Sequence, residues 1–317
     1  MRVLVTGADG FVGAALCRSL LAHGYEVRAA VREVKGTPRA DVVAVGGTDG
    51  RTFWTPALQD VSVVVHLVGV AHRSPTSTLD VFQRVNVDGS VNLARQAAAA
   101  GVRRLVYLSS VKAQGEQTGH TRFTEAHEPR PEDAYGASKL AAERGLLGVA
   151  QDTGLEIVII RPPLVYGPGV KGNVLKLLKW IDRRLPVLVS SRGNRRSLVG
   201  LGNLISLIMS CIDHPRAAGE VFLVSDNEDL STEDLVRRFA ARLGRRPCLI
   251  PVSLGLAVWL ARLLKQEGQI RRLFGSLMVD SAKARNLLGW KPVVSVDEEI
   301  ERTAVWFRSV QNKATGR

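Results

Sequence analysis

A glycine turn directly after the first apolar run limits the folds open to this chain. The run Val3-Leu4-Val5 has the composition of a buried strand, and glycines follow it at positions 7, 10 and 13. The first glycine allows a tight turn, the second lets the backbone approach a pyrophosphate, and the third lets the next helix pack close to the strand. The N–H groups and the positive dipole at that helix start suit phosphate. The residues predicted to hold a dinucleotide here are Gly7, Gly10, Phe11, Val12 and Gly13.

Short valine-rich runs alternate with segments of helical periodicity through the first half of the chain. Runs of this size and composition are typical of buried parallel strands. The predicted strands span residues 3–5, 27–31, 42–45, 61–67, 105–108 and 157–160, and the predicted helices span 11–22, 81–100 and 135–152. This alternation predicts an α/β fold of the Rossmann type with a doubly wound parallel sheet.

The pattern changes after Arg161. Prolines at 162 and 163 and the turn Gly167-Pro168-Gly169 break the alternation. We predict a helix over 173–182, a Gly/Arg/Ser-rich loop, a strand at 221–224, and helices capped by Ser231 and Ser295. Residues 1–161 and about 198–228 are expected to form the dinucleotide-binding domain, and about 162–197 and 229–317 a smaller, mostly helical substrate-binding lobe.

Composition narrows the class of protein further. The net charge of +13 comes from basic residues scattered along the chain without a basic tail, so nucleic-acid binding is not expected. The cysteines at 17, 211 and 248 are too far apart in sequence to indicate a disulfide framework or a metal site. The longest apolar stretch, 253–264, is too short to span a bilayer and is expected to form a buried or partly amphipathic helix, with an interfacial membrane helix as the alternative. Without a signal peptide, a cytoplasmic location is expected.

Tyr135 and Lys139 are the strongest candidates for catalysis. Four residues apart on a predicted helix, they share one face. A lysine charge near a tyrosine hydroxyl lowers the pKa of the phenol, which can then exchange a proton with a substrate oxygen. Ser110 ends a predicted strand, and the carboxyl ends of strands are where an open α/β sheet binds ligands. It is placed to bond the same oxygen.

Four motifs together give this pair a context. They are the glycine turn, Ser109-Ser110, Tyr135-Gly136-Ala137-Ser138-Lys139 and the segment from Arg161 to Gly169. Their order and spacing over about 175 residues resemble the extended short-chain dehydrogenases/reductases, the NAD-dependent epimerase/dehydratase family. The resemblance implies an acid/base role for Tyr135, a nicotinamide-ribose contact for Lys139 and a catalytic hydroxyl for Ser110. It also implies a homodimer and further cofactor contacts from Leu67, Val68, Asn86 and Pro162.

The end of the second predicted strand bears on the choice of cofactor. An acid there would accept hydrogen bonds from the adenosine ribose of NAD. This chain has Ala30-Val31-Arg32 instead, and an arginine suits the 2′-phosphate of NADP. NADP(H) is therefore favoured, and NAD(H) stays possible.

The resemblance also suggests a substrate. Asn173, Arg196 and Arg272 (or its neighbour Arg271) match positions that bind a UDP-sugar, and Lys112 would lie beside the sugar. Dehydratases of the family carry an acid pair where this chain has Val111-Lys112-Ala113, which argues against dehydration.

Two enzymatic activities then remain. Two features favour NADPH-dependent 4-keto reduction of a UDP-4-keto-6-deoxy-(N-acetyl)hexosamine. Arg32 indicates NADP, which a net reduction consumes, and the segments 109–112, 195–199 and 276–280 resemble those of bacterial 4-reductases of surface-polysaccharide pathways. A UDP-sugar 4-epimerase with tightly bound NAD is the alternative. A non-catalytic NADP-binding sensor or structural subunit is the second alternative.

Overall fold

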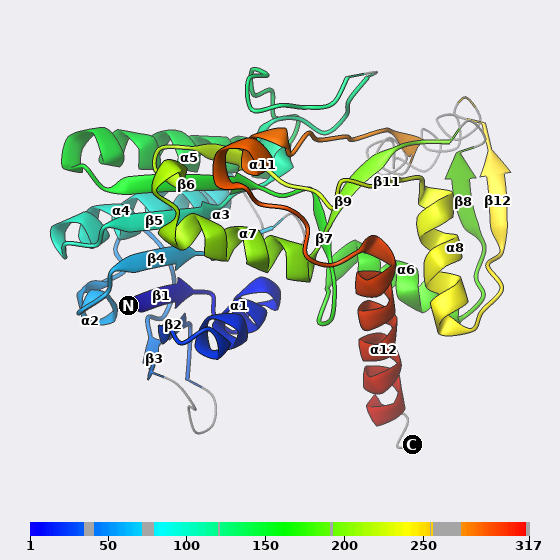
Figure 1. Cartoon of the computed structure of the whole chain (residues 1–317), viewed down its shortest axis with the longest axis horizontal. Helices are drawn as coiled ribbons and strands as arrows, with labels where there is room; N and C mark the ends of the chain where they lie inside the picture. The colour runs from blue at the N-terminus through cyan, green and yellow to red at the C-terminus, as the bar shows by residue number, and fades with distance from the viewer. Residues whose placement is uncertain are drawn as a thin grey trace.

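The computed structural model describes residues 1–34, 41–71, 79–119, 121–190, 193–253, 255 and 274–314. Its largest element is a parallel sheet of seven strands in the order β10-β6-β5-β4-β1-β2-β3 (Figure 1). The strands are β1 (Arg2–Thr6), β2 (Glu26–Val31), β3 (Asp41–Ala44), β4 (Val63–His66), β5 (Arg104–Leu108), β6 (Glu156–Arg161) and β10 (Val221–Leu223). Strand order reverses beside β1, which is the ligand-binding crevice of a doubly wound sheet. The predicted Rossmann-type fold is confirmed.

Helices cover both faces of this sheet because alternate strand residues are apolar on both sides. Val3 and Val5 of β1 belong to a core shared with one helical layer, while Leu4 belongs to a core on the opposite face. The first layer holds α1 (Phe11–Ala22) and α7 (Leu201–Asp213), which pack against each other (Figure 1). The second holds α2 (Thr55–Leu58), α3 (Leu79–Phe82), a π-helical turn (Gln83–Asp88), α4 (Gly89–Ala99) and α5 (Ala134–Thr153).

A smaller lobe follows β6. It contains β7 (Leu164–Tyr166), α6 (Gly172–Asp182), β8 (Val187–Ser190), β9 (Arg196–Gly200), β11 (Asp229–Leu230), α8 (Thr232–Leu243), β12 (Leu249–Val252) and α12 (Val296–Ala314). Helix α11 (Ala282–Leu288) lies on the large sheet's side, with Ala284 and Leu288 in the first core. Helices α6, α8 and α12 lie together in Figure 1, and Val174, Phe239 and Phe307 share one apolar core.

The lobe is less purely helical than expected. Strands β11, β9 and β7 form one small sheet, and β12 pairs with β8 in parallel. The predicted loop before residue 198 therefore contains β8 and the start of β9. The predicted helix 253–264 lies almost wholly outside the described residues, as does Arg272. The two-domain boundaries stay a prediction, although β10 does return to the large sheet beside β6.

Candidate active site

The glycine turn has the shape that a dinucleotide requires. Gly7 has a φ of +66°, a left-handed conformation that favours glycine. A Cβ on Gly13 would lie 2.1 Å from the Gly7 carbonyl oxygen, so only glycine lets α1 start this close to β1. The first amide that bonds within α1 is that of Ala14, to Gly10 O at 3.0 Å. The amides of Phe11, Val12 and Gly13 are therefore the helix-start donors that a pyrophosphate would use.

The end of β4 lies against this turn. A Cβ on Gly7 would be 3.3 Å from Val68 Cγ2, and Leu67 N donates to Thr6 Oγ1 at 3.1 Å. The same Thr6 hydroxyl lies 2.7 Å from His66 Nδ1. Burial, and then the charge of Lys139, lower the pKa of His66 to about 3. This histidine is neutral at ordinary pH and serves to hold β4 against β1.

Arg32 and Asn86 lie at the edges of this crevice. Arg32 follows directly after β2 and is exposed, where a dinucleotide's adenosine ribose is expected. Asn86 is buried in the π-helical turn before α4. Its amide donates to Ser138 Oγ at 2.9 Å and accepts from Val70 N at 2.8 Å. It thus ties the segment after β4 to the helix that carries Tyr135 and Lys139.

Ser110 and Tyr135 meet at the carboxyl edge of β5. Ser110 caps a short 3-10 turn, Val111–Ala113, by accepting from Lys112 N at 3.2 Å. Tyr135 is in the first turn of α5. Burial raises the pKa of Tyr135 to about 12, a hydrogen bond with Ser110 opposes this change, and the Asp133 charge adds to it. The structure thus brings Ser110, rather than Ser109, beside the Tyr135 hydroxyl.

Lys139 is buried and bonds a different tyrosine. Its Nζ donates to Tyr107 Oη at 3.1 Å and to Leu108 O at 2.9 Å. Burial lowers the pKa of Lys139 to about 8, and the Glu143 charge opposes this. The pKa of Tyr135 is raised overall, because burial outweighs the other effects on it. A lowering of that pKa by Lys139 stays a prediction. Sequence reasoning missed Tyr107, since an aromatic residue inside a strand is usually part of the core.

A buried ion pair between Arg161 and Glu143 lies next to the site. Arg161 Nε lies 3.0 Å from Glu143 Oε1, and both side chains are almost fully buried. Ser109 donates to the same carboxylate, and Gln114 accepts from Arg161. This cluster links α5, β5 and β6, and it explains why the second residue of the serine pair is the one left for chemistry. Pro162, next to Arg161, accepts from Val111 N at 2.9 Å.

Lys112 makes two ion pairs next to Ser110 and the first turn of α5. Its Nζ lies 2.8 Å from Glu116 Oε1 and 2.5 Å from Asp133 Oδ2. Asp133 in turn caps α5 by accepting from Gly136 N at 2.7 Å. The structure therefore supplies two carboxyl groups near Ser110 that are not adjacent to it in sequence, but both are held in ion pairs with Lys112.

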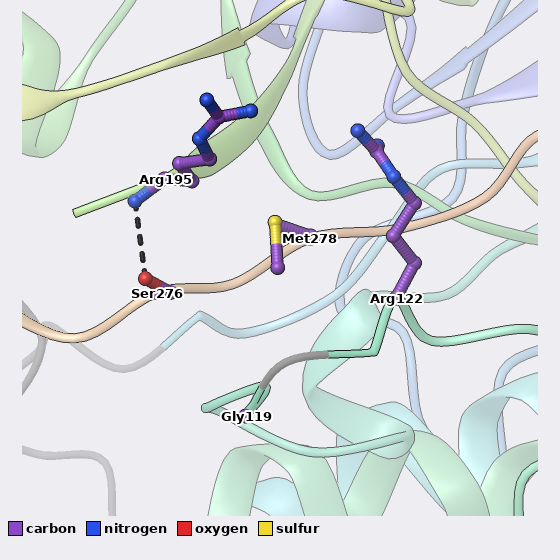
Figure 2. A pocket seen from close by; sticks show the side chains of 5 residues that line it. All are labelled: Gly119, Arg122, Arg195, Ser276 and Met278. Carbon is purple, nitrogen blue, oxygen red and sulfur yellow. Dashed lines mark hydrogen bonds between the residues drawn. The ribbon is translucent and has the colours of Figure 1, made fainter.

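The lobe residues predicted to bind substrate are more dispersed. Asn173 is exposed near the start of α6, and Arg196 Nη1 donates to Gly275 O at 2.9 Å. Its neighbour Arg195 lines a pocket of about 400 Å³ (Figure 2). The other lining residues are Gly119, Arg122, Ser276 and Met278. Arg122, which the sequence did not single out, lies 2.6 Å from Asp229 Oδ2.

In the described part of the chain, no group of three or more His, Cys, Asp or Glu side chains is placed to hold a metal ion. None of the helices described is long and apolar enough to cross a membrane.

Known proteins resemble this chain over nearly its whole length. The NAD dependent epimerase/dehydratase family matches residues 3–225. A UDP-glucose 4-epimerase from Vibrio cholerae is 39% identical over 98% of this chain and 97% of its own. MoeE5, solved with UDP-glucuronic acid and NAD, has a TM-score of 0.81 at 25% identity, covering 98% of this chain and 100% of its own. A UDP-glucuronic acid 4-epimerase from Bacillus cereus, solved with NAD, shares the fold at a TM-score of 0.81 and 21% identity, covering 98% and 99%. The chain belongs to the NAD-dependent epimerase/dehydratase family.

Proposed function

We propose that this enzyme reduces the 4-keto group of a nucleotide sugar with NADPH. The observation that carries the proposal is the Ser110–Tyr135 pair at the carboxyl edge of β5, close to Lys139 and the glycine turn. With a pKa of about 12, Tyr135 keeps its proton at neutral pH. A protonated phenol is the form that a reduction needs, because the keto oxygen must gain a proton when C4 gains a hydride.

Each residue then has a role in the reduction. The turn from Gly7 to Gly13 and the start of α1 would hold the pyrophosphate of the dinucleotide, and Lys139 its nicotinamide ribose. The bound nicotinamide supplies the hydride. Ser110 donates a hydrogen bond to the keto oxygen and orients it toward Tyr135, which transfers its phenolic proton to that oxygen. The buried ammonium of Lys139 stabilises the phenolate that remains.

The proposed substrate is a UDP-4-keto-6-deoxy-(N-acetyl)hexosamine used for surface polysaccharide. Asn173, Arg196 and Arg272 would bind its UDP part, since an arginine fork suits a diphosphate. Dehydration is disfavoured, because Glu116 and Asp133 are held in ion pairs by Lys112. The expected homodimer and cytoplasmic location stay predictions.

Arg32 supports NADP(H) over NAD(H) in this proposal. It is exposed and follows β2 directly, so an arginine occupies the position where an acid would contact the ribose of NAD. We expect Arg32→Asp to lower kcat/KM for NADPH by about 10–100-fold, because a charge-assisted hydrogen bond contributes about 1.5–3 kcal/mol. The same change should improve kcat/KM for NADH. Steady-state kinetics with both cofactors measures the switch, and an unchanged preference would contradict the role of Arg32.

A UDP-sugar 4-epimerase is the second candidate, and the Vibrio cholerae relative favours it. That reaction uses the same residues, with Tyr135 first accepting the proton and then returning it. A sensor or structural subunit that only binds NADP is disfavoured by the presence of both Tyr135 and Lys139.

One pair of assays separates these functions. The purified enzyme should oxidise NADPH when given a UDP-4-keto-6-deoxysugar, and Tyr135→Phe should reduce turnover by about 10²–10⁴-fold without loss of NADPH binding. Interconversion of UDP-glucose and UDP-galactose without added cofactor, with NAD released on denaturation, would establish the epimerase instead. Cofactor binding with neither activity would leave only the sensor.

A further inference from the structure

A cluster of charged side chains connects the turn that follows Ser110 with the start of α5, which carries Tyr135. This cluster, here called the clamp, consists of Lys112, Glu116 and Asp133. Lys112 is the second residue of the turn that Ser110 caps. A Cβ on Gly136 would lie 2.4 Å from Lys112 O, so the first turn of α5 rests directly on the backbone of that turn. Lys112 Nζ also reaches Asp133, the residue that caps α5 two positions before Tyr135.

The charges of the clamp are unequal in number. One ammonium faces two carboxylates, and both of these are largely buried, with side chains 9% and 11% exposed. Burial alone would raise the pKa of Asp133, but hydrogen bonds from Lys112 and from Gly136 N outweigh it and hold the pKa low, at about 2. Asp133 is therefore a permanent anion at neutral pH.

That anion lies close to the catalytic phenol. The Asp133 charge raises the pKa of Tyr135, in the same direction as burial. An uncompensated carboxylate here would oppose the phenolate that forms when Tyr135 gives up its proton. The N-cap is nevertheless needed, since it fixes the start of the helix that carries Tyr135 and Lys139.

We propose that Lys112 is a positioning residue that neutralises Asp133, so that this carboxylate can cap α5 without acting against the charge that develops on Tyr135. This role rests on the proposed function only in assuming that Tyr135 transfers a proton. It assigns Lys112 to the catalytic helix and not to direct binding of the sugar.

The other groups around Tyr135 have separate effects. Ser110 bonds the phenol from the 3-10 turn, and Lys139 lies one turn further along α5. Tyr107 on β5 is coupled to Tyr135 by charge, but its own pKa is raised well above its usual value by burial. Phe82 of α3 packs against the Tyr135 ring and carries no charge. Among these neighbours, Asp133 is the anion that Lys112 controls.

Four variants test the clamp. Lys112→Met removes the cation and keeps the length of the side chain, while Lys112→Arg keeps the cation. Asp133→Asn keeps an oxygen that can cap Gly136 N and removes the charge. The double variant Lys112→Met/Asp133→Asn removes both charges of the ion pair. Fluorotyrosine placed at 135 in each protein is titrated by ¹⁹F NMR, because its more acidic phenol ionises at a pH that the fold tolerates.

The expected results distinguish an electrostatic role from a merely structural one. In Lys112→Met the fluorotyrosine should titrate at higher pH, and kcat should fall about 10-fold, as one pKa unit of a catalytic group implies. KM should change little, and Lys112→Arg should restore both readouts. The double variant should recover most of the lost kcat. An unchanged titration in Lys112→Met, or a double variant no better than the single one, would overturn the proposal.

The titration does not depend on the substrate. If the wild-type enzyme fails to reduce the keto-sugar but the fluorotyrosine titration moves as expected, the proposed function is wrong and the clamp stands. If turnover is found but the titration does not move, the clamp is wrong and the proposed function stands. Thermal unfolding of each variant identifies any change caused by misfolding. If Lys112→Met misfolds, the two least disruptive changes decide: the fluorotyrosine should titrate at lower pH in Asp133→Asn and at the wild-type pH in Lys112→Arg, and an unchanged titration in Asp133→Asn would overturn the proposal.

Discussion

Gly13 and Gly148 both lie in helices that cover the large sheet, but a methyl group would have opposite effects at the two positions. A Cβ on Gly13 would meet Gly7 O at 2.1 Å and Ala8 Cα at 2.9 Å, whereas a Cβ on Gly148 meets nothing within 4 Å. Gly13→Ala should therefore push α1 away from β1, lower the free energy of unfolding by about 1–3 kcal/mol and weaken dinucleotide binding. Gly148→Ala should add about 0.5–1 kcal/mol, because alanine is the better helix former.

Urea denaturation and calorimetric titration with NADPH measure the two variants. A Gly13→Ala protein that binds the dinucleotide as well as the wild type would rule out the close approach of α1 to the phosphates. Gly148→Ala is the matched control, in which a methyl group is added at a position with space for it.

The sequence predicted the elements that carry the candidate catalytic residues better than it predicted the contacts of these residues. A spacing of four places Tyr135 and Lys139 on one helical face, but it does not say which partner a long side chain reaches. The lysine bonds Tyr107 from a neighbouring strand. Lys112 was expected near the sugar, yet its two anions come from positions 4 and 21 residues further along the chain. Contacts of this kind depend on how elements pack, which local patterns do not encode.

Two adjacent arginines show how position in an element decides the effect of a charge. Both Arg103 and Arg104 lie within 3.2 Å of Glu156 Oε2. Arg104, the first residue of β5, is buried and also donates to the carbonyls of Cys211, Ile212 and His214 at the end of α7. Arg104 thus joins β5 to the last turn of α7.

Arg104→Met should lower the free energy of unfolding by about 3–5 kcal/mol, because it leaves buried polar groups without a partner. Arg103→Met should cost less, about 1 kcal/mol, since Arg103 is 44% exposed and solvent weakens both its ion pair and its single hydrogen bond to this helix end, from Nη2 to Ile212 O at 3.2 Å. Guanidinium denaturation measures both. Equal losses in the two variants would mean that the carbonyl contacts of Arg104 do not stabilise the α7 terminus.

Elements that are defined by local sequence were predicted, whereas elements that depend on a partner far away in the chain were not. The helix over 11–22 matches α1 at both ends, because an apolar face and the glycine turn define it locally. The strand β8 was missed in a segment that also contains glycine, arginine and serine. Its partner β12 pairs Leu249 with Val187, across 62 residues. The run 187–189 has the composition of a strand, but no glycine turn and following helix mark it as one. Short strands in the lobe form only where the fold brings two such segments together.

At the scale of the whole molecule, Glu299 joins the last helix to the junction between the sheet and the lobe. Its side chain is 2% exposed and fills a space next to Gly167, Gly200 and Gly202, where a Cβ would lie 2.7–3.2 Å from its atoms. Close by, Asp226 accepts from Tyr166 Oη at 2.8 Å and from Gly200 N. The three glycines leave room for a carboxyl group, and α12 places it there.

This buried carboxyl should make the stability of the whole protein depend on pH. Burial and the Asp226 charge raise the pKa of Glu299 to about 7, although Arg302 opposes this, from an ordinary value of 4.5. The folded state thus holds the proton more tightly than the unfolded chain. The resulting stability is fully present below pH 4.5 and is lost as pH rises through about 7.

Glu299→Gln should therefore be more stable than the wild type at pH 8, by about 1–3 kcal/mol, and equally stable near pH 4.5. The amide has the shape of the protonated acid and cannot ionise. Glu298→Gln is the matched control: Glu298 is 52% exposed and pairs with Arg302 at 2.6 Å, so its effect should stay below about 1 kcal/mol. Urea denaturation from pH 4.5 to 8 measures all three proteins. If the curves of the wild type and Glu299→Gln stay parallel over this range, the pKa of Glu299 is the same in the folded and the unfolded chain, and the junction between lobe and sheet accommodates its charge.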